Sequence, residues 1–242
     1  MSVWYFIIAN PVLNVLVALT SLLGGSFGGA IIVLTVIVRL ISWPLTKRQL
    51  NSTKAMQEMQ PRIQELQKKY GKNQQKLQQE MMKLYKEAGI NPLGCIWPML
   101  IQLPIWIALY QAIMSALATT PESLLGLAQR LYSWDIVNQA IPLSSQFLWL
   151  DLSRPDPYFI LAIIVGGTMW VQQKMTTAPT VDPRQQSTNR MMTLLMPLMF
   201  GFLTLMFPSG LALYWAVSNI IGIVTQYFVT GGWGYLRPRS PS

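Results

Sequence analysis

The sequence predicts an all-α polytopic membrane protein, and its composition, charge distribution and hydrophobic pattern each support that fold class. Of the 242 residues, 52% are hydrophobic and only 11% are charged. The charges cluster, so that four long stretches carry none: Met1–Val38, Ala88–Pro121, Pro157–Gln173 and Met191–Leu236. These stretches are continuously apolar and do not alternate every second residue, which indicates membrane helices and not the strands of an outer-membrane barrel.

We expect five transmembrane helices to form the core. Their predicted bounds are Phe27–Trp43, Pro92–Leu117, Tyr158–Gln173, Met191–Met206 and Leu211–Thr230. Pro44 ends the first helix, and Phe207-Pro208-Ser209-Gly210 supplies the proline and glycine of a tight turn between the last two. Two of the five hold only 16 residues, which is about 24 Å of helix against an acyl core of about 30 Å. Either their ends lie further out or the bilayer is locally thin.

The N-terminal residues 1–23 are predicted to form an amphipathic helix in the membrane interface. Val3–Leu22 is apolar enough to span, but Asn10 and Asn14 lie four residues apart and therefore share one face. Polar groups on one face favour an interfacial helix, with a spanning helix as the alternative. A cleaved signal peptide is not expected, because no Lys or Arg precedes the apolar stretch.

The polar segment 47–90 is predicted to form a helical hairpin. Apolar residues recur every three or four positions on both sides of a turn at Gly71-Lys72-Asn73. They are Met56, Met59, Ile63, Leu66 and Tyr70, and then Leu77, Met81, Leu84 and Ala88. Ten basic and four acidic residues give this segment a local excess of +6. Two interpretations stay open: the lysines fix topology and touch anionic lipid, or they bind an acidic partner, ribosomal RNA or a nascent chain.

The distribution of Lys and Arg predicts the orientation. Ten lie in 47–86, three in 174–190 and two in the tail, whereas the 118–156 loop holds only Arg130 and Arg154. Basic segments stay in the cytoplasm, so we expect the N-terminus outside and the C-terminus inside. The expected organisation is an interfacial helix (1–23), a five-helix core (24–46 and 91–236), a cytoplasmic hairpin (47–90) and a short cytoplasmic tail (237–242).

Most catalytic and metal chemistry is excluded by composition. The chain has no His and a single Cys, Cys95, so neither a Ser-His or Cys-His pair nor a thiol/imidazole metal site can form. We therefore expect no enzyme activity, no catalytic residue, no metal and no cofactor. An intramembrane protease is a third alternative, which would need a Ser–Lys pair, and Lys174 is the one lysine near a span interior.

Arg39 interrupts an apolar run, Ala30–Trp43, that otherwise predicts a membrane helix. An arginine at a helix centre costs about 2.5–3.5 kcal/mol to insert, so it must face protein or a water-filled cavity, or extend toward the interface near Trp43. Other polar or amphipathic side chains within the spans are Thr35, Gln102, Trp215, Asn219 and Gln226. Individually these residues join helices by hydrogen bonds. Together with an arginine they could line a polar cavity.

Three groups of residues resemble the YidC-type membrane protein insertases, which are relatives of the mitochondrial oxidase-assembly and chloroplast insertases. The first group is Val38-Arg39-Leu40, Pro44-Leu45-Thr46, Gln49, Ser52, Lys54-Ala55-Met56, Gln60-Pro61 and Lys69-Tyr70. The second is Asn91-Pro92, Gly94-Cys95, Pro98, Gln102-Leu103-Pro104 and Ala108-Leu109-Tyr110. The third is Phe207-Pro208, Gly210-Leu211, Leu213-Tyr214-Trp215, Ser218-Asn219 and Gln226. The resemblance covers nearly the whole chain.

This resemblance implies a five-helix core around a hydrophilic groove that is open to the cytoplasm and to lipid. Arg39 matches the family's groove arginine, which attracts acidic residues of a client while the client's apolar segment slides into the bilayer. The implied groove residues are Arg39, Thr35, Gln102, Trp215, Asn219 and Gln226, and the implied client or ribosome contacts are Lys68, Lys69, Lys72, Lys76 and Lys83.

The implied partners are newly made membrane proteins and lipids in a bacterial plasma membrane, with the Sec translocon and the ribosome as candidates and no DNA. The chain looks like the minimal form, because it lacks the large external domain of many Gram-negative-type members. A small solute transporter or channel with Arg39 as an anion site is the alternative function. No paired half-helix break or inverted repeat supports it.

Overall fold

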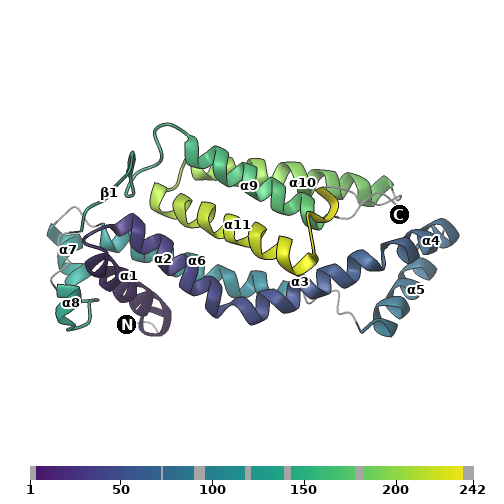
Figure 1. Ribbon diagram of the computed structural model, residues 1–242, viewed down its shortest axis with the longest axis horizontal. Coiled ribbons are helices and arrows are strands. Elements are labelled where there is room, and N and C mark those ends of the chain that lie inside the picture. The colour runs from purple at the N-terminus through teal and green to yellow at the C-terminus, as the bar shows by residue number, and fades with distance from the viewer. Residues whose placement is uncertain are drawn as a thin grey trace.

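The computed structural model describes residues 4–71, 73–89, 96–117, 121–138, 143–177 and 183–236. Helices make up most of this structure, which confirms the all-α class (Figure 1). A π-helix, Tyr5–Ala9, leads into α1 (Asn10–Leu22), which is followed by α2 (Phe27–Ile41), α3 (Trp43–Glu58), α4 (Gln60–Tyr70), α5 (Gln74–Glu87) and α6 (Ile96–Ala116). Next come α7 (Pro121–Ala128), α8 (Asp135–Asn138), β1 (Gln146–Phe147), β2 (Leu150–Asp151), α9 (Ile160–Thr176), α10 (Pro183–Thr204), α11 (Ser209–Thr230) and a 3₁₀ turn, Gly234–Leu236.

Two helical segments among the described residues are long and apolar enough to cross a membrane: Tyr5–Leu22 and α11. A third candidate is α2 together with the first part of α3, which are bent by 62° relative to each other. The apolar part of α6, Leu103–Ala116, is shorter. The count of five spans therefore stays a prediction, because several of the expected helices are short.

The first predicted span ends earlier than expected. Helix α2 stops at Ile41, and Pro44 lies in the first turn of α3 and not after the last turn of the span. A proline is tolerated there because the first N–H groups of a helix have no partner within it. Ser42 joins the two helices, since its N–H donates to Val38 O (2.9 Å) and its carbonyl accepts from Thr46 N (2.9 Å). The chain thus bends by 62° shortly after Arg39, and the start of α3 still packs on α11 and α6.

Helix α1 is packed into the bundle against α2 and α6. The side chains of Asn10 and Asn14, whose shared face favoured an interfacial helix, are buried. Asn14 Nδ2 donates to Arg130 O (3.0 Å), Asn14 Oδ1 accepts from Tyr132 N (2.6 Å), and Asn10 Oδ1 accepts from Arg130 Nε (3.0 Å). The two amides therefore hold the segment after α7. The interfacial position of α1 stays a prediction, because Tyr5–Leu22 also has the length of a span.

Helices α9 and α10 pack closely through glycine. A Cβ built on Gly166 would lie 3.3 Å from Pro197 O, and one built on Gly201 would lie 3.3 Å from Ala162 O. Apolar burial does not drive helices together in lipid, so small residues that let backbones approach are the usual solution. This pair lies side by side with α11, which packs on α9 and α2 (Figure 1).

The charged helices α4 and α5 form an antiparallel pair at one end of the molecule, beyond the end of α3 (Figure 1). Asn73 caps α5, because its Oδ1 accepts from Lys76 N (3.1 Å). Ile63 is buried between the two helices' apolar faces, as the spacing predicts. The first arm is divided at Met59 into α3 and α4, a break that the pattern did not predict.

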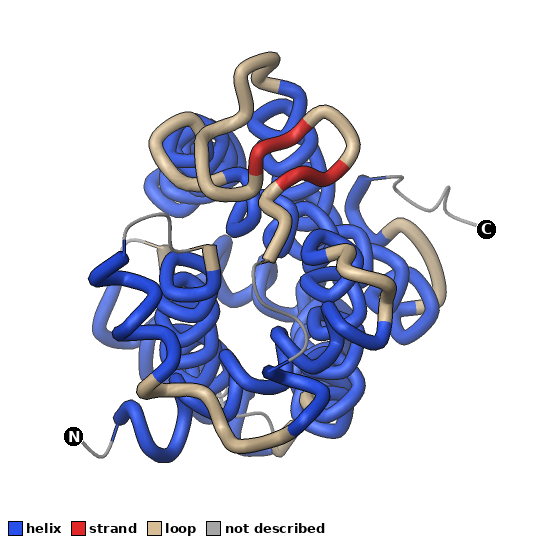
Figure 2. Tube along the Cα trace, turned by 90° about the vertical axis from the view of Figure 1, so that its left-hand side faces the viewer, coloured by secondary structure: helices blue, strands red, loops and turns tan. Residues whose placement is uncertain are grey.

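At the opposite end, α7, α8 and the small antiparallel β1–β2 hairpin cover the bundle (Figures 1 and 2). The hairpin pairs Gln146 with Asp151 and Phe147 with Leu150. The ring of Phe147 lies where a side chain on Gly28 of α2 would be, so glycine is required there. Sequence patterns predicted only a loop in this region.

Candidate functional site: a polar cavity inside the bundle

Arg39 lies in the last turn of α2 and reaches across to α11. Its Nε and Nη2 donate to Ser218 Oγ at 3.0 and 2.6 Å, and Nη2 also donates to Ser218 O at 2.8 Å. Within the described part of the chain, Arg39 forms no ion pair and its Nη1 has no hydrogen-bond partner. The positive charge is therefore satisfied by neutral acceptors and keeps the capacity to bind an anion.

A cavity of about 530 Å³ opens beside Arg39. Residues of α2, α3, α6, α9, α10 and α11 line it, including the polar side chains Gln49, Gln172, Gln173, Thr176, Asn219 and Gln226. On α11 the lining runs from Tyr214 to Gln226, about 18 Å along the helix axis. The cavity is therefore long enough to accept an extended or helical stretch of polypeptide.

Aromatic rings form the end of the cavity nearest the α10–α11 turn. Trp215 stacks on Trp106, with centroids 5.6 Å apart and planes at 23°, and Phe207 meets both rings edge-on. Phe200 packs edge-on against the same Trp215. Such contacts fix ring orientation and add stability beyond burial. This end therefore presents a rigid apolar surface, and the polar groups lie on the other side of Arg39.

Asn219 has a structural role as well as a place in the lining. Its Nδ2 donates to Thr168 Oγ1 (3.2 Å) and Val165 O (3.4 Å) on α9. Three residues further on, Gly222 leaves space for Gln172, because a Cβ there would lie 2.6 Å from Gln172 Nε2. The amide side chains of the cavity are thus placed by close contact between α9 and α11.

Gln226 is 1% exposed, and neither Oε1 nor Nε2 has a hydrogen-bond partner among the described residues. Leaving a buried polar group unsatisfied costs about 1–3 kcal/mol. The amide borders the cavity, so a polar ligand or water entering it would recover this energy. Trp106 Nε1 is unpartnered in the same sense.

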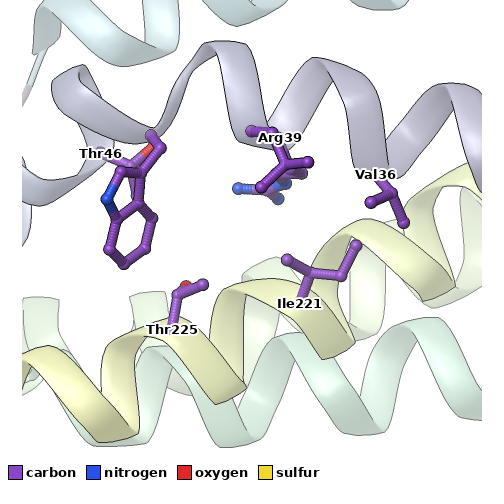
Figure 3. A pocket seen from close by; sticks show the side chains of 7 residues that line it. Val36, Arg39, Thr46, Ile221 and Thr225 are labelled. Carbon is purple, nitrogen blue, oxygen red and sulfur yellow. The ribbon is translucent and has the colours of Figure 1, made fainter.

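A second, smaller cavity of about 130 Å³ lies on the other side of Arg39, between α2 and α11 (Figure 3). It is lined by Val36, Leu40 and Trp43, which are exposed, and by Ile221 and Thr225 of α11. The guanidinium therefore lies between the large cavity, which carries the amide side chains, and an apolar outer face, and it borders both cavities.

Four of the six predicted groove residues line the large cavity: Arg39, Trp215, Asn219 and Gln226. Thr35 does not, because it is 1% exposed and its hydroxyl donates to Ile31 O (2.6 Å) within its own helix. The side chain of Gln102 lies outside the described residues. The sequence interpretation missed Ser218 and Gln172 as site residues, although Ser218 lies one turn after Trp215 on the same stripe.

The predicted basic contacts lie on α4 and α5. Lys69 and Lys76 lie over the ring of Tyr70, with Nζ 5.3 and 5.4 Å from its centroid. Lys83 pairs with Glu80 at 2.8 Å, and this hydrogen bond lowers the pKa of Glu80 and raises the pKa of Lys83. Lys68 is in the last turn of α4, and Lys72 lies outside the described residues.

Comparisons with known proteins agree on one family. A family described as "60Kd inner membrane protein" matches residues 18–233. The "Membrane protein insertase YidC" of Histophilus somni is 41% identical over 229 residues, and that of Nitratidesulfovibrio vulgaris is 37% identical over 226 residues. The matches cover 95% and 93% of this chain but 38% of each relative, so the chain spans well under half the length of these proteins.

The fold leads to the same family. A crystal structure described as an active YidC insertase with the first transmembrane domain resolved aligns with a TM-score of 0.60 and 32% sequence identity. The alignment covers 87% of this chain and 43% of that one.

Proposed function

Because this chain belongs to the 60Kd inner membrane protein family, whose relatives include YidC membrane protein insertases, we propose that it moves apolar client segments from the cytoplasm into the bilayer. The observation that carries the proposal is the cavity with amide side chains beside Arg39, an arginine without an ion-pair partner among the described residues. The clients are newly made membrane proteins of a bacterial plasma membrane. The chain lies there with its N-terminus outside and its C-terminus in the cytoplasm.

The cavity acts by lowering the barrier for polar client groups. A charged or polar residue that crosses hydrocarbon loses its hydrogen bonds with water, and this loss is the main cost of translocation. The amides of Gln172 and Gln226 and the hydroxyl of Thr176 offer replacement partners part of the way across. The client's polar end therefore crosses only the remaining apolar layer near Trp215.

Arg39 supplies the electrostatic step. A client carboxylate that enters the cavity replaces the neutral acceptors of Ser218 as the partner of the guanidinium. A carboxylate adds the attraction of an opposite charge, which a serine hydroxyl or carbonyl cannot supply, and it can accept two parallel hydrogen bonds from the guanidinium, so the exchange is favourable. When the carboxylate leaves, the guanidinium forms its hydrogen bonds with Ser218 again, so the contact between Arg39 and the client is transient. No covalent step is involved.

The apolar part of the client leaves sideways, between α2 and α11. Val36, Leu40 and Ile221 line the small cavity beside Arg39 (Figure 3). Val36 and Leu40 are exposed, so in this scheme they face lipid. A client whose acidic tail lies in the large cavity can therefore place its apolar segment against these residues. The client's apolar segment then moves from contact with these apolar side chains into contact with lipid, without crossing water.

The α4–α5 hairpin receives clients in this scheme. Lys68, Lys69 and Lys76 present positive charge at its tip, whereas the charge of Lys83 is paired with Glu80. A basic surface of this kind suits anionic lipid headgroups and acidic segments, and ribosomal RNA by the same chemistry. The Sec translocon and the ribosome are the proposed cooperating partners.

Reconstitution of the purified chain in liposomes tests this function. Protease protection would measure the insertion of a short single-span client with an acidic outer tail. We expect insertion with the unmodified chain and with Arg39→Lys, and little with Arg39→Ala. Arg154→Ala is the matched control, because Arg154 is 81% exposed and lines neither cavity. If the folded protein inserts no client but supports flux of an anionic solute, transport would replace insertion as the proposed function.

A further inference from the structure

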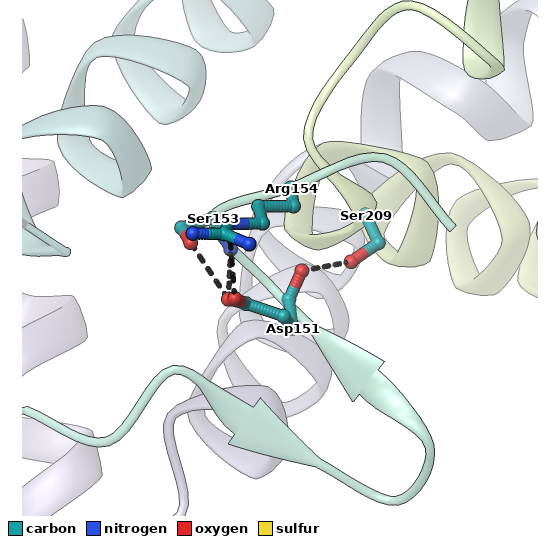
Figure 4. A network of polar contacts seen from close by, with 4 residues as sticks. All are labelled: Asp151, Ser153, Arg154 and Ser209. Carbon is teal, nitrogen blue, oxygen red and sulfur yellow. Dashed lines mark hydrogen bonds and ion pairs between the residues drawn. The ribbon is translucent and has the colours of Figure 1, made fainter. Parts of the chain in front are cut away.

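The β1–β2 hairpin lies at the depth where membrane helices begin. Ser209, the first residue of α11, donates from its Oγ to Asp151 O (2.7 Å; Figure 4). Its N–H donates to Arg154 O (2.7 Å). The next residue, Gly210, donates from its N–H to Leu152 O (3.1 Å). Since α11 is long and apolar enough to span, these bonds fix the hairpin at one boundary of the bilayer, at the end of the molecule away from α4 and α5.

The turn of this hairpin holds an apolar residue in a strained conformation. Leu148 and Trp149 are the two residues between the strands, and Leu148 has φ of 57° and is 76% exposed. Two-residue turns of this kind favour Asn and Gly, which adopt positive φ at little cost. Leucine gains nothing from this conformation in water, because it has no polar group to bond locally.

A second strained apolar residue lies at the same boundary. Phe159, directly before α9, has φ of 59° and is 57% exposed. Leu148 and Phe159 are the non-glycine residues with positive φ in the described part of the chain. Buried Asp156 holds the second turn, because its Oδ1 accepts from Tyr158 N (3.1 Å) and its Oδ2 from Leu161 N (2.7 Å).

We propose that Leu148, Trp149, Tyr158 and Phe159 insert into the headgroup–acyl boundary of the leaflet opposite the α4–α5 hairpin and anchor this end of the protein there. All four are exposed. Strained residues persist where the surroundings compensate for the strain, and contact with lipid supplies apolar burial. Trp and Tyr are also the residues that membrane interfaces favour.

The occupant of this surface is lipid, because the patch continues into apolar helix surface. Tyr158 and Phe159 lead directly into Ile160 and Ile163, which are exposed on α9. The segment Gln146–Leu150 carries no charge. The nearest charged side chains after it, Asp151 and Arg154, contact each other at 3.6 Å. The proposal concerns the position of the protein in the bilayer and does not depend on insertase activity.

A fluorescent probe in vesicles tests the anchor. In a Cys95→Ser chain, Leu148→Cys would be labelled with a nitrobenzoxadiazole probe and reconstituted in phosphatidylcholine with or without bromine at shallow acyl positions. Two controls on the same loop carry the probe at exposed polar positions, Gln146→Cys and Arg154→Cys. They measure any affinity of the probe itself for lipid.

We expect the brominated lipid to quench the probe at 148 several-fold more than the probes at 146 and 154, and aqueous iodide to show the reverse order. A probe at 148 that iodide reaches as readily as at 154 would overturn the proposal. Equal quenching by lipid at all three positions would also overturn it, because the result would then reflect the probe and not Leu148.

Discussion

Arg39 and Ser218 join α2 to α11 by three hydrogen bonds, two to the hydroxyl and one to the carbonyl oxygen of the serine. The pair connects α2, after which the chain bends into α3, to α11, which lines the large cavity along its length. It also supplies hydrogen-bond acceptors to a partly buried cation without neutralising it. The same contact therefore contributes stability and leaves a positive charge that an anionic ligand, in our proposal a client carboxylate, can bind.

Ser218→Ala removes both hydroxyl contacts and keeps the carbonyl. We expect the free energy of unfolding in lipid nanodiscs to fall by about 1–3 kcal/mol, because hydrogen bonds to a charged group are lost. Ser218→Thr keeps the hydroxyl and serves as the control. If the free energy of unfolding is the same in the alanine variant, water in the cavity replaces the Ser218 hydroxyl as the acceptor for Arg39.

Gln226→Leu should separate stability from activity. The substitution removes two buried polar atoms without partners, so we expect stability to be unchanged or to rise by about 1–3 kcal/mol. Client insertion should fall, because the cavity loses an amide. Asn219→Leu is the comparison, since its amide donates to Thr168 and its loss should lower stability. A destabilised Gln226→Leu chain would mean that the native amide is satisfied after all.

Adjacent glycines on α9 provide a matched pair for helix packing. A Cβ on Gly166 would lie 3.3 Å from the backbone oxygen of Pro197, whereas a Cβ on Gly167 has no atom within 4 Å. Gly166→Ala should therefore be less stable than Gly167→Ala by about 1–3 kcal/mol, the usual effect of overpacking. Chemical denaturation in mixed micelles would measure the difference. Equal stability would show that α9 and α10 separate at no cost.

The β1–β2 hairpin should loosen in acid. Partial burial raises the pKa of Asp151, but hydrogen bonds from the Ser153 hydroxyl and N–H and from Ser145, together with the charge of Arg154, leave that pKa below its ordinary value. A lowered pKa in the folded state adds stability above the unfolded value, near pH 4, and this stability is lost as pH falls through the folded value.

Hydrogen exchange of the peptide containing Ser209 would follow this effect, because Ser209 bonds to the hairpin. Protection in the unmodified chain should approach that of Asp151→Asn as the pH drops below about 4. The two chains are compared at each pH, so the intrinsic dependence of exchange on pH cancels. If the difference in protection between the two chains stays constant across this pH range, the charge of Asp151 does not stabilise the hairpin.

Periodicity and turn residues predicted the features that depend on local sequence. The α4–α5 pair with its turn at Gly71 and the α10–α11 turn before Ser209 follow from spacing, glycine and proline. The β1–β2 hairpin could not be predicted, because its turn residues, Leu148 and Trp149, contradict the usual turn composition.

The cavity was predictable in part. Arg39 and Gln226 are polar residues within apolar runs, and that signal suffices to select them. Thr35 gives the same signal, but its hydroxyl bonds to Ile31 of its own helix, which sequence spacing cannot distinguish from a place in the cavity. Gln172 belongs to the site because Gly222 lies opposite, and such a contact between distant segments has no local signature.

The most direct test of the central claim is a double-mutant cycle between Arg39 and the client. Insertion of one client, with either aspartate or asparagine in its outer tail, would be measured in liposomes that hold the unmodified chain or Arg39→Ala. We predict that Arg39→Ala slows insertion of the aspartate client and has much less effect on the asparagine client, so that the two changes couple. An equal effect of Arg39→Ala on both clients would contradict the electrostatic role of Arg39.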